Sequence, residues 1–356
     1  MVRETEIITK DAITLLKELI AIPSFSAEEA GTAEVLSRFL TDRGVATSRV
    51  GNNVWARNRH FDAAKPSLLL NSHHDTVKPN SGYTRDPYLP QVAGDLLYGL
   101  GSNDAGGALV SLIATFLFFY ERAGLTYNLV LGASAEEETS GPGGIETLLH
   151  SLPPIDCAIV GEPTLMQLAV AERGLMVLDC TASGTSGHAA RNEGENALYK
   201  AHDDIAFLRN HPFHKTSLLL GDVKLTATVI NTGNKAHNVV PDNCSFVVDV
   251  RVNELYTMEE VLDTLQASMQ SRVVPRSMRL RSSSIPLSHP LVKAGLALGR
   301  EYYGSPTTSD KALMPFPALK MGPGFSARSH TADEFIHLSE ISEGIALYIQ
   351  LLNQIL

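Results

Sequence analysis

Cysteine is scarce in this sequence. The 356 residues include only Cys157, Cys180 and Cys244, an odd number without C-x-x-C spacing, which argues against a disulfide framework and against a cysteine zinc site. A reducing compartment is therefore expected, and we assign the chain to the cytoplasm. No serine or cysteine nucleophile stands at an interpretable spacing from a base, so the sequence gives no support to covalent catalysis.

Long apolar runs are also missing. Residues 1–6 are charged and lack the apolar core of a signal peptide. The longest apolar stretch, Ala108 to Tyr120, is interrupted by Ser111 and Thr115 and is shorter than a membrane span. We therefore expect a buried helix there and no membrane partner.

Positive charge is in deficit. Lysine and arginine total 29 against 39 aspartates and glutamates, a net charge of −10, which argues against nucleic acid as a partner. An anionic small substrate needs only a local arginine, so it stays possible. The hydrophobic content of 44% and the charged content of 19% are ordinary for a soluble enzyme, and the length suggests about two domains.

Polar side chains follow several buried strands. The run Leu68 to Ser72 predicts a strand that ends in His73 and Asp75. A carboxylate two residues after a histidine commonly orients that histidine as a metal ligand, although such a triplet also arises often by chance. A second strand runs into residues 136–138, all glutamate, and a third ends at Glu162. Because open α/β sheets keep their sites at the carboxyl ends of strands, we expect these groups to meet at one edge.

Two further candidates lie outside these strands. Asp104 precedes the apolar helix in a glycine-rich segment, where an N-cap aspartate is the alternative to a ligand. His330 lies in a loop rich in glycine and proline, Gly322 to Glu334, which is a reasonable place for a last ligand. A solvated acidic patch is the alternative for residues 136–138, but such patches seldom end a buried strand.

The order of expected elements indicates an inserted domain. Residues 175–285 contain strand, helix, strand, strand, helix and strand, with the last strand at about Met278 to Ser283, which is a ferredoxin-like α+β arrangement. Residues 1–174 and 286–356 have α/β character and form the flanking domain. Its expected helices include one opened by a capping box at Ser26 to Glu29 and one from Leu291 to Tyr303.

Taken together, these ordered motifs resemble the M20 metallopeptidase and deacylase family over nearly the whole chain. The matching segments are Ser72 to Val77, Leu97 to Asp104, residues 136–138, Gly161 to Thr164 and Ser329 to Thr331. The resemblance implies a zinc-peptidase-like α/β catalytic domain, a mixed sheet flanked by helices, with an inserted ferredoxin-like lid and dimerisation domain. Glu136, Ala105-Gly106 and His74 depart from the family pattern, but none of them removes a ligand.

The resemblance also implies the site. It makes His73, Asp104, Glu138, Glu162 and His330 the metal ligands of two zinc ions, for which cobalt is a possible substitute. Borderline zinc accepts imidazole and carboxylate ligands together, so this set is chemically consistent. His73 and Glu162 would hold one ion, Glu138 and His330 the other, with Asp104 between them. Glu137 is then the general base, and Asp75 is the partner that orients His73.

In the inserted domain the resemblance implies three more site residues. His188 would be a lid histidine acting on the partner subunit of a homodimer, although a surface histidine is the simpler alternative. Asn238 and Arg251 would bind substrate. Arg251 is the candidate for a substrate carboxylate, because a guanidinium can hold a carboxylate through two hydrogen bonds. A strand-end surface arginine is the alternative for Arg251.

The leading function is hydrolysis of a small N-acyl amino acid, acetyl- or succinyl-ornithine or -citrulline, in arginine biosynthesis. The segment Ser309 to His330 looks most like acetylornithine and acetylcitrulline deacetylases. A succinyl-diaminopimelate desuccinylase or a dipeptidase is the nearest rival, and a metal-binding scaffold without catalysis is the alternative of another class.

Overall fold

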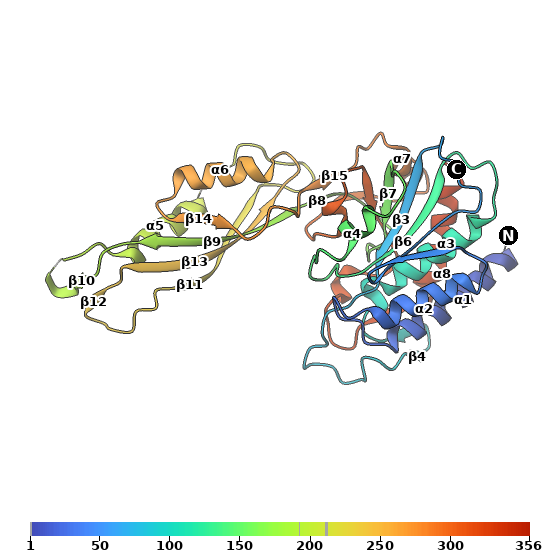
Figure 1. Cartoon of the computed structure of the whole chain (residues 1–356), viewed down its shortest axis with the longest axis horizontal. Coiled ribbons are helices and arrows are strands. Elements are labelled where there is room, and N and C mark those ends of the chain that lie inside the picture. Colours follow the sequence, from blue (N-terminus) through green and yellow to red (C-terminus); the bar gives the residue numbers. More distant parts are fainter. Residues whose placement is uncertain (1, 192, 211–212) are drawn as a thin grey trace. The chain divides into compact units, whose positions relative to one another are not determined.

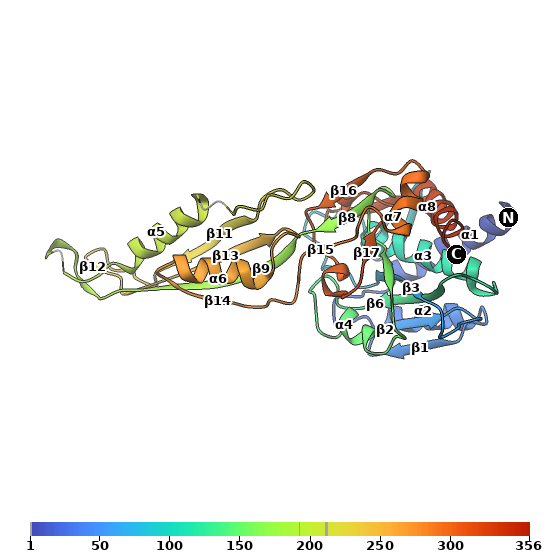
Figure 2. The same cartoon turned by 90° about the horizontal axis from the view of Figure 1, so that it is seen from above.

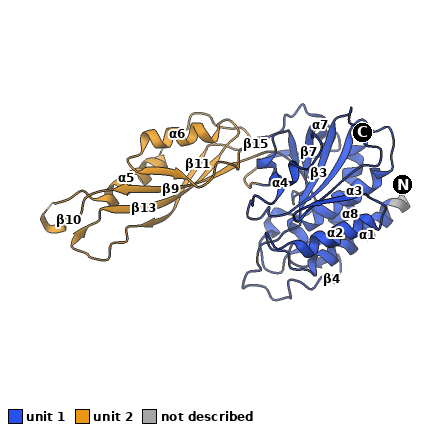
Figure 3. Cartoon of the chain, viewed as in Figure 1, with its two compact units in different colours: residues 1–170, 284–303, 309–356 blue, residues 171–283, 304–308 orange. Residues whose placement is uncertain are grey.

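The computed structural model describes residues 2–191, 193–210 and 213–356. The chain forms two compact units (Figure 3). Unit 1 comprises Met1–Val170, Ser284–Tyr303 and Ser309–Leu356, and unit 2 comprises Ala171–Ser283 and Gly304–Thr308. Each unit has its own core and is described by itself.

A mixed sheet forms the centre of unit 1, with strand order β1-β2-β6-β3-β7-β17-β8-β15 and β16 on β8 (Figure 1). The strands are β1 (Thr47–Val50), β2 (Asn53–Arg57), β3 (Ser67–His73), β6 (Asn128–Ser134), β7 (Cys157–Val160), β8 (Leu168–Glu172), β15 (Ser283–Ser284), β16 (Tyr302–Ser305) and β17 (Ala318–Lys320). The neighbours β6, β3, β7 and β17 run parallel and are buried along their whole length. Their carboxyl ends therefore lie at the same edge of the sheet.

Helices cover both faces of these parallel strands (Figures 1 and 2). α3 (Gly107–Tyr120) contacts β3 and β6 and packs against α1 (Val2–Ile20) and α8 (Leu338–Leu352). On the other face, Leu148 of α4 (Ile145–Leu149) packs with Leu69 of β3. Alternation along β3 then turns Leu68 and Leu70 away from α4. The remaining elements of unit 1 are α2 (Ala30–Thr41), α7 (Pro290–Ala297) and a small sheet of β4 (Gln91–Ala93), β5 (Leu96–Tyr98) and β18 (Phe335–His337).

The apolar segment expected to be a buried helix is α3, and this prediction is confirmed. All of its residues except Leu117 are buried. Among the described residues, only the segment Ser102–Tyr120 is long and apolar enough to cross a membrane, and 89% of its most apolar window is buried inside the fold. Each buried leucine or phenylalanine contributes about 1.5–3 kcal/mol, so this helix belongs to the core.

Unit 2 has the expected ferredoxin-like arrangement. Its elements are β9 (Gly174–Ser183), α5 (Ala197–Asn210), β11 (Lys224–Asn231), β13 (Asn243–Val252), α6 (Met258–Ser268) and β14 (Arg272–Pro275). The strand order is β11-β13-β9-β14, and every neighbouring pair is antiparallel. Alternate residues of β9 and β13, such as Leu178 and Val248, form its core with Leu265 of α6.

Two expected elements are wrong. The last strand of unit 2 is β14 and not Met278 to Ser283, because Val273 enters the core and the strand pairs with β9 before the expected start. The helix expected to reach Tyr303 ends at Ala297. Gly299 adopts a positive φ of 74°, which suits a helix end, and the chain then enters β16.

Candidate metal and catalytic site

The strand ends of the central sheet bring three of the expected ligands of unit 1 together. His73 is the last residue of β3, and its neighbours β6 and β7 lead directly into residues 136–138 and Glu162. His330 lies in the loop after β17. Three adjacent parallel strands thus deliver an imidazole and several carboxylates to one sheet edge, where α/β proteins place their sites.

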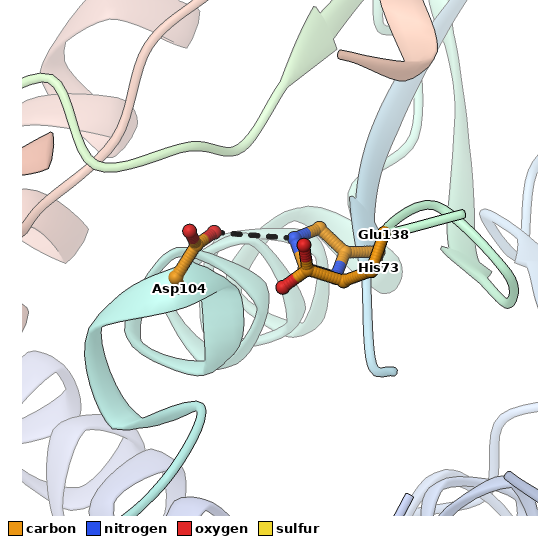
Figure 4. A group of neighbouring side chains, drawn as sticks. All are labelled: His73, Asp104 and Glu138. Carbon is orange, nitrogen blue, oxygen red and sulfur yellow. Dashed lines mark ion pairs between the residues drawn. The ribbon is translucent and has the colours of Figure 1, made fainter. Parts of the chain in front are cut away.

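His73 lies at the centre of the cluster (Figure 4). Its side chain is 1% exposed, and its Nε2 is 3.4 Å from Asp104, 3.8 Å from Glu162 and 3.9 Å from Glu137. None of these distances is a hydrogen bond, and this buried nitrogen has no hydrogen-bond partner among the described residues. Candidate ligand atoms lie within 4.8 Å of one another in two triplets, His73 with Asp104 and Glu138, and His73 with Glu137 and Glu162.

Asp104 faces both histidines. One carboxylate oxygen, Oδ1, is 3.4 Å from Nε2 of His73, and the other, Oδ2, is 3.6 Å from Nε2 of His330. His330 also contacts Glu138, with 3.0 Å between Nε2 and Oε2. Asp104 does not cap α3, whose N-cap is Gly106, so the N-cap alternative is wrong. Asp104 therefore presents one carboxylate oxygen to each histidine.

The pKa values of the clustered histidines and of Glu137 are raised, which indicates that the cluster favours bound positive charge. Burial opposes protonation of His73, but the carboxylates of Glu137, Asp104 and Asp75 outweigh it and hold the pKa of His73 well above its ordinary value. The hydrogen bond to Glu138 raises the pKa of His330 to about 9. Burial raises the pKa of Glu137 well above its ordinary value. Imidazole and carboxylate donors around an unpartnered buried nitrogen fit divalent zinc, which would replace these protons.

Asp75 supports both His73 and the acidic segment. Its Oδ1 is 3.3 Å from Nδ1 of His73, and its carboxylate accepts the backbone N–H groups of Glu137 and Glu138 at 3.1 Å each. Burial would raise the pKa of Asp75, but the adjacent imidazole of His73 outweighs burial, and the pKa falls to about 2. Asp75 is therefore ionised at neutral pH, and its backbone carbonyl, 3.0 Å from Nδ1 of His73, fixes the ring of that histidine.

The capping box expected at Ser26 is wrong. The N-cap of α2 is Glu29, which makes no side-chain cap bond. Ser26 instead donates its hydroxyl to Oδ2 of Asp75 at 2.7 Å. A serine followed three residues later by a glutamate has the same local pattern whether the serine caps a helix or binds a distant carboxylate. Only the long-range contact with Asp75 distinguishes the two.

Glu29 is a buried support that the sequence did not reveal. Its Oε1 accepts the backbone N–H groups of Ala27 at 2.7 Å and of Glu136 at 3.1 Å, and its Oε2 accepts Nδ2 of Asn52 at 2.8 Å. Together, Glu29 and Asp75 bind the consecutive backbone N–H groups of residues 136–138. These two carboxylates therefore fix the backbone from which the candidate base and a candidate ligand project.

His74, a departure from the family pattern, belongs to the same network. Its Nε2 is 3.0 Å from the carbonyl of Asn52 and its Nδ1 is 2.9 Å from the hydroxyl of Thr32. Burial lowers the pKa of His74, so the ring is neutral. Nε2 then donates to the carbonyl of Asn52. The ring thus joins the end of β3 to α2.

A third buried carboxylate, Glu334, holds the segment that carries Asp104. It is 2% exposed and accepts the backbone N–H groups of Gly101, Asn103 and Asp104 at 2.8–3.1 Å. Burial and the nearby Asp104 raise its pKa to about 8. The sequence offered one sign that Glu334 belongs to the site, which is its position shortly after His330 in the same loop.

We expect Glu29→Gln to lower kcat by about 10- to 100-fold with little change in KM, because a small displacement of a catalytic group is costly. The new amide would place an N–H donor against the Nδ2 donor of Asn52. Adding Asn52→Asp restores a donor–acceptor pair, so Glu29→Gln/Asn52→Asp should recover most of kcat. Steady-state measurements of kcat and KM for the single and double variants test this positioning role. A double variant as slow as the single one would contradict the positioning role.

The three remaining candidates belong to unit 2. His188 is exposed on β10 (Gly187–His188), which pairs with β12 (Val239–Val240), and the carbonyl of Asn238 accepts the N–H of Ala189 at 3.0 Å. His188 and Asn238 are therefore close neighbours. Arg251, on β13, already pairs with Asp249 through Nε–Oδ1 at 2.8 Å and Nη2–Oδ2 at 3.1 Å.

Sequence comparisons identify curated relatives. The chain is 27% identical over 275 residues to a succinyl-diaminopimelate desuccinylase of Cereibacter sphaeroides, covering 72% of this chain and 71% of the relative. It is 25% identical over 376 residues to the succinyl-diaminopimelate desuccinylase of Xanthomonas oryzae pv. oryzae, covering 97% and 99% of the two chains.

Solved structures share the fold. Aminopeptidase PepT from Bacillus cereus has a TM-score of 0.78 at 16% identity, covering 98% of each chain. The YXEP protein of Bacillus subtilis, described as a dinuclear metal-binding peptidase from the M20 family, has a TM-score of 0.74 at 15% identity, covering 98% of each chain. The expected fold class is confirmed. The family model for peptidase family M20/M25/M40 matches residues 69–354, and the chain therefore belongs to this family of metal-dependent amide hydrolases.

Proposed function

We propose that the chain hydrolyses the amide bond of an N-acyl amino acid at a site for two zinc ions. The observation that carries this proposal is the position of Asp104, whose two carboxylate oxygens face different histidines. His73 and Glu162 would hold one ion and Glu138 and His330 the other, with Asp104 shared. Cobalt is a possible substitute. When bound, the ions supply polarisation of the amide carbonyl and acidification of the attacking water.

Glu137 is the proposed general base. It takes a proton from the water that adds to the carbonyl carbon and delivers it to the amide nitrogen as the C–N bond breaks, giving a carboxylic acid and an amine. A scaffold that only binds metal would have no use for this carboxylate beside the ligands.

The substrate proposal places N-succinyl-diaminopimelate first, because the curated relatives carry that name. N-acetyl- or N-succinyl-ornithine and -citrulline are the second candidate, from the motifs around Ser309 to His330. Asp310 and Lys311 of that segment are buried, and Asp310 accepts hydrogen bonds from Asn71 at 2.9 Å and Ser134 at 2.5 Å. They support the sheet behind the site, so they carry little information on the substrate side chain.

A substrate panel tests this proposal. The zinc-loaded protein is assayed with N-succinyl-diaminopimelate, with N-succinyl- and N-acetyl-ornithine and -citrulline, and with an unacylated dipeptide. We expect the highest kcat/KM for N-succinyl-diaminopimelate. A preference for an ornithine or citrulline derivative would shift the proposal to the second candidate, and turnover of none of them would contradict it.

The proposed roles of unit 2 complete the site. We propose that the chain is a cytoplasmic homodimer joined through unit 2, with His188 acting on the partner subunit. Asn238 and Arg251 are proposed to bind substrate. Since Asp249 already takes two N–H groups of the Arg251 guanidinium, only part of that side chain is left for a substrate carboxylate.

A further inference from the structure

A cavity of unit 1 adjoins the candidate metal site. It has a volume of about 210 Å³, and its lining includes Lys78, Asn80, Tyr83, His330 and Thr331. One water molecule occupies about 30 Å³ in the liquid, so this cavity accepts a group of several atoms. Because His330 contributes to both the cavity and the ligand cluster, a group in the cavity would be bound next to the reacting amide.

Lys78 is the lysine of this cavity, and it has no carboxylate partner among the described residues. Its ammonium lies 5.6 Å from the centroid of the Phe25 ring, and the described part of the chain provides no acidic side chain within ion-pair distance of it. Asn80, in contrast, is engaged, because its Nδ2 donates to the carbonyl of His330 at 3.3 Å and its Oδ1 accepts from Gly82 at 2.9 Å.

We propose that this cavity binds a carboxylate of the substrate and that Lys78 is its cation. The inference rests on the proposed amide hydrolysis and adds a subsite to it. An N-succinyl amino acid brings at least two carboxylates to a chain of net charge −10. The two proposed zinc ions already balance the carboxylates of their own site, so a separate cation such as Lys78 favours binding of a substrate carboxylate beside it. The carboxylate comes either from the acyl group or from the α-carbon of the amino acid.

Kinetics of Lys78→Met, which removes the charge from an exposed side chain, test the proposal. Lys78→Arg keeps the charge, and Lys293→Met makes the same charge change on exposed α7 outside the cavity. The substrates are an N-succinyl amino acid, its N-acetyl analogue and the N-acetyl amino amide, which has no carboxylate. We expect Lys78→Met to lower kcat/KM by about tenfold or more through KM, with Lys78→Arg close to wild type.

The substrates separate the two sources of the carboxylate. A loss confined to the succinyl compound identifies the acyl carboxylate, and an equal loss for succinyl and acetyl compounds with none for the amide identifies the α-carboxylate. The same loss for all three substrates, no loss for any of them, or an equal loss in Lys293→Met would overturn the proposal.

Calorimetric binding keeps this test separate from the proposed function. Succinate and acetate are titrated into the zinc-loaded wild-type and Lys78→Met proteins. Both anions offer one carboxylate to the metal site, but only succinate has a second one. We expect wild type to prefer succinate and Lys78→Met to lose that preference. An unchanged preference would exclude the acyl carboxylate. Unchanged binding of the free amino acid to Lys78→Met as well would overturn the subsite, whereas failure of the wild type to hydrolyse any acyl amino acid would overturn only the proposed function.

Discussion

Glu137→Gln is expected to lower kcat by about 10²-fold or more, because the amide cannot take the proton of the attacking water. The metal content should stay near two ions per chain, since the proposed base is not a ligand. The backbone N–H of Glu137 continues to bind Asp75, so the local fold is retained. Steady-state kinetics and elemental analysis of the purified variant provide the two measurements.

Glu138→Gln is the matched control for that variant. Glu138 is the neighbouring carboxylate, and its Oε2 lies 3.0 Å from Nε2 of His330. As a proposed ligand, it should lose metal together with activity. If Glu137→Gln lost its metal and Glu138→Gln kept it, the two roles would be exchanged. Near wild-type activity of Glu137→Gln would remove the general base from the account.

His188→Ala is expected to lower kcat by about 10²–10³-fold with little change in metal content. The proposed role of His188 is to donate a hydrogen bond to the oxyanion that forms during attack, and the loss of one such donor has this effect. The side chain is exposed on a two-stranded element of unit 2, so its removal should leave the thermal midpoint of unfolding unchanged. A large fall in that midpoint would indicate a structural role instead.

Mixing His188→Ala with Glu137→Gln tests action across subunits. Each homodimer lacks one essential group at both sites, whereas a mixed dimer has one site with an intact base and an intact histidine from the partner. About half of the wild-type activity per mixed dimer is expected for independent sites in a two-fold dimer. No recovery despite verified subunit exchange would mean that His188 acts within its own chain or has no catalytic role.

The sequence located three of the candidate ligands because the segments that carry them follow short buried strands. Runs such as Leu68 to Leu70 are apolar on both faces, and the carboxyl ends of parallel neighbours lie at the same sheet edge. The order of strands around β3 then brings His73 beside Glu138 and Glu162 without any information on side-chain contacts. This part of the site depends on local patterns and on general rules of topology.

The supports of the site depend on contacts between distant segments, so local patterns could not predict them. Ser26 and Glu29 have the spacing of a capping box, yet Ser26 binds Asp75 and Glu29 binds the N–H of Glu136. Glu334 binds the segment around Asp104 from 230 residues away along the chain. A carboxylate that accepts backbone N–H groups leaves no periodic signal in the sequence.

The most direct test of the central claim is anomalous diffraction at the zinc edge from crystals of the zinc-loaded protein. Two strong peaks per chain are expected. One should lie among His73, Asp104 and Glu162, and the other among Asp104, Glu138 and His330, both in wild type and in Glu137→Gln. A single peak at full zinc loading, or peaks away from Asp104, would contradict a dinuclear site built on that shared carboxylate.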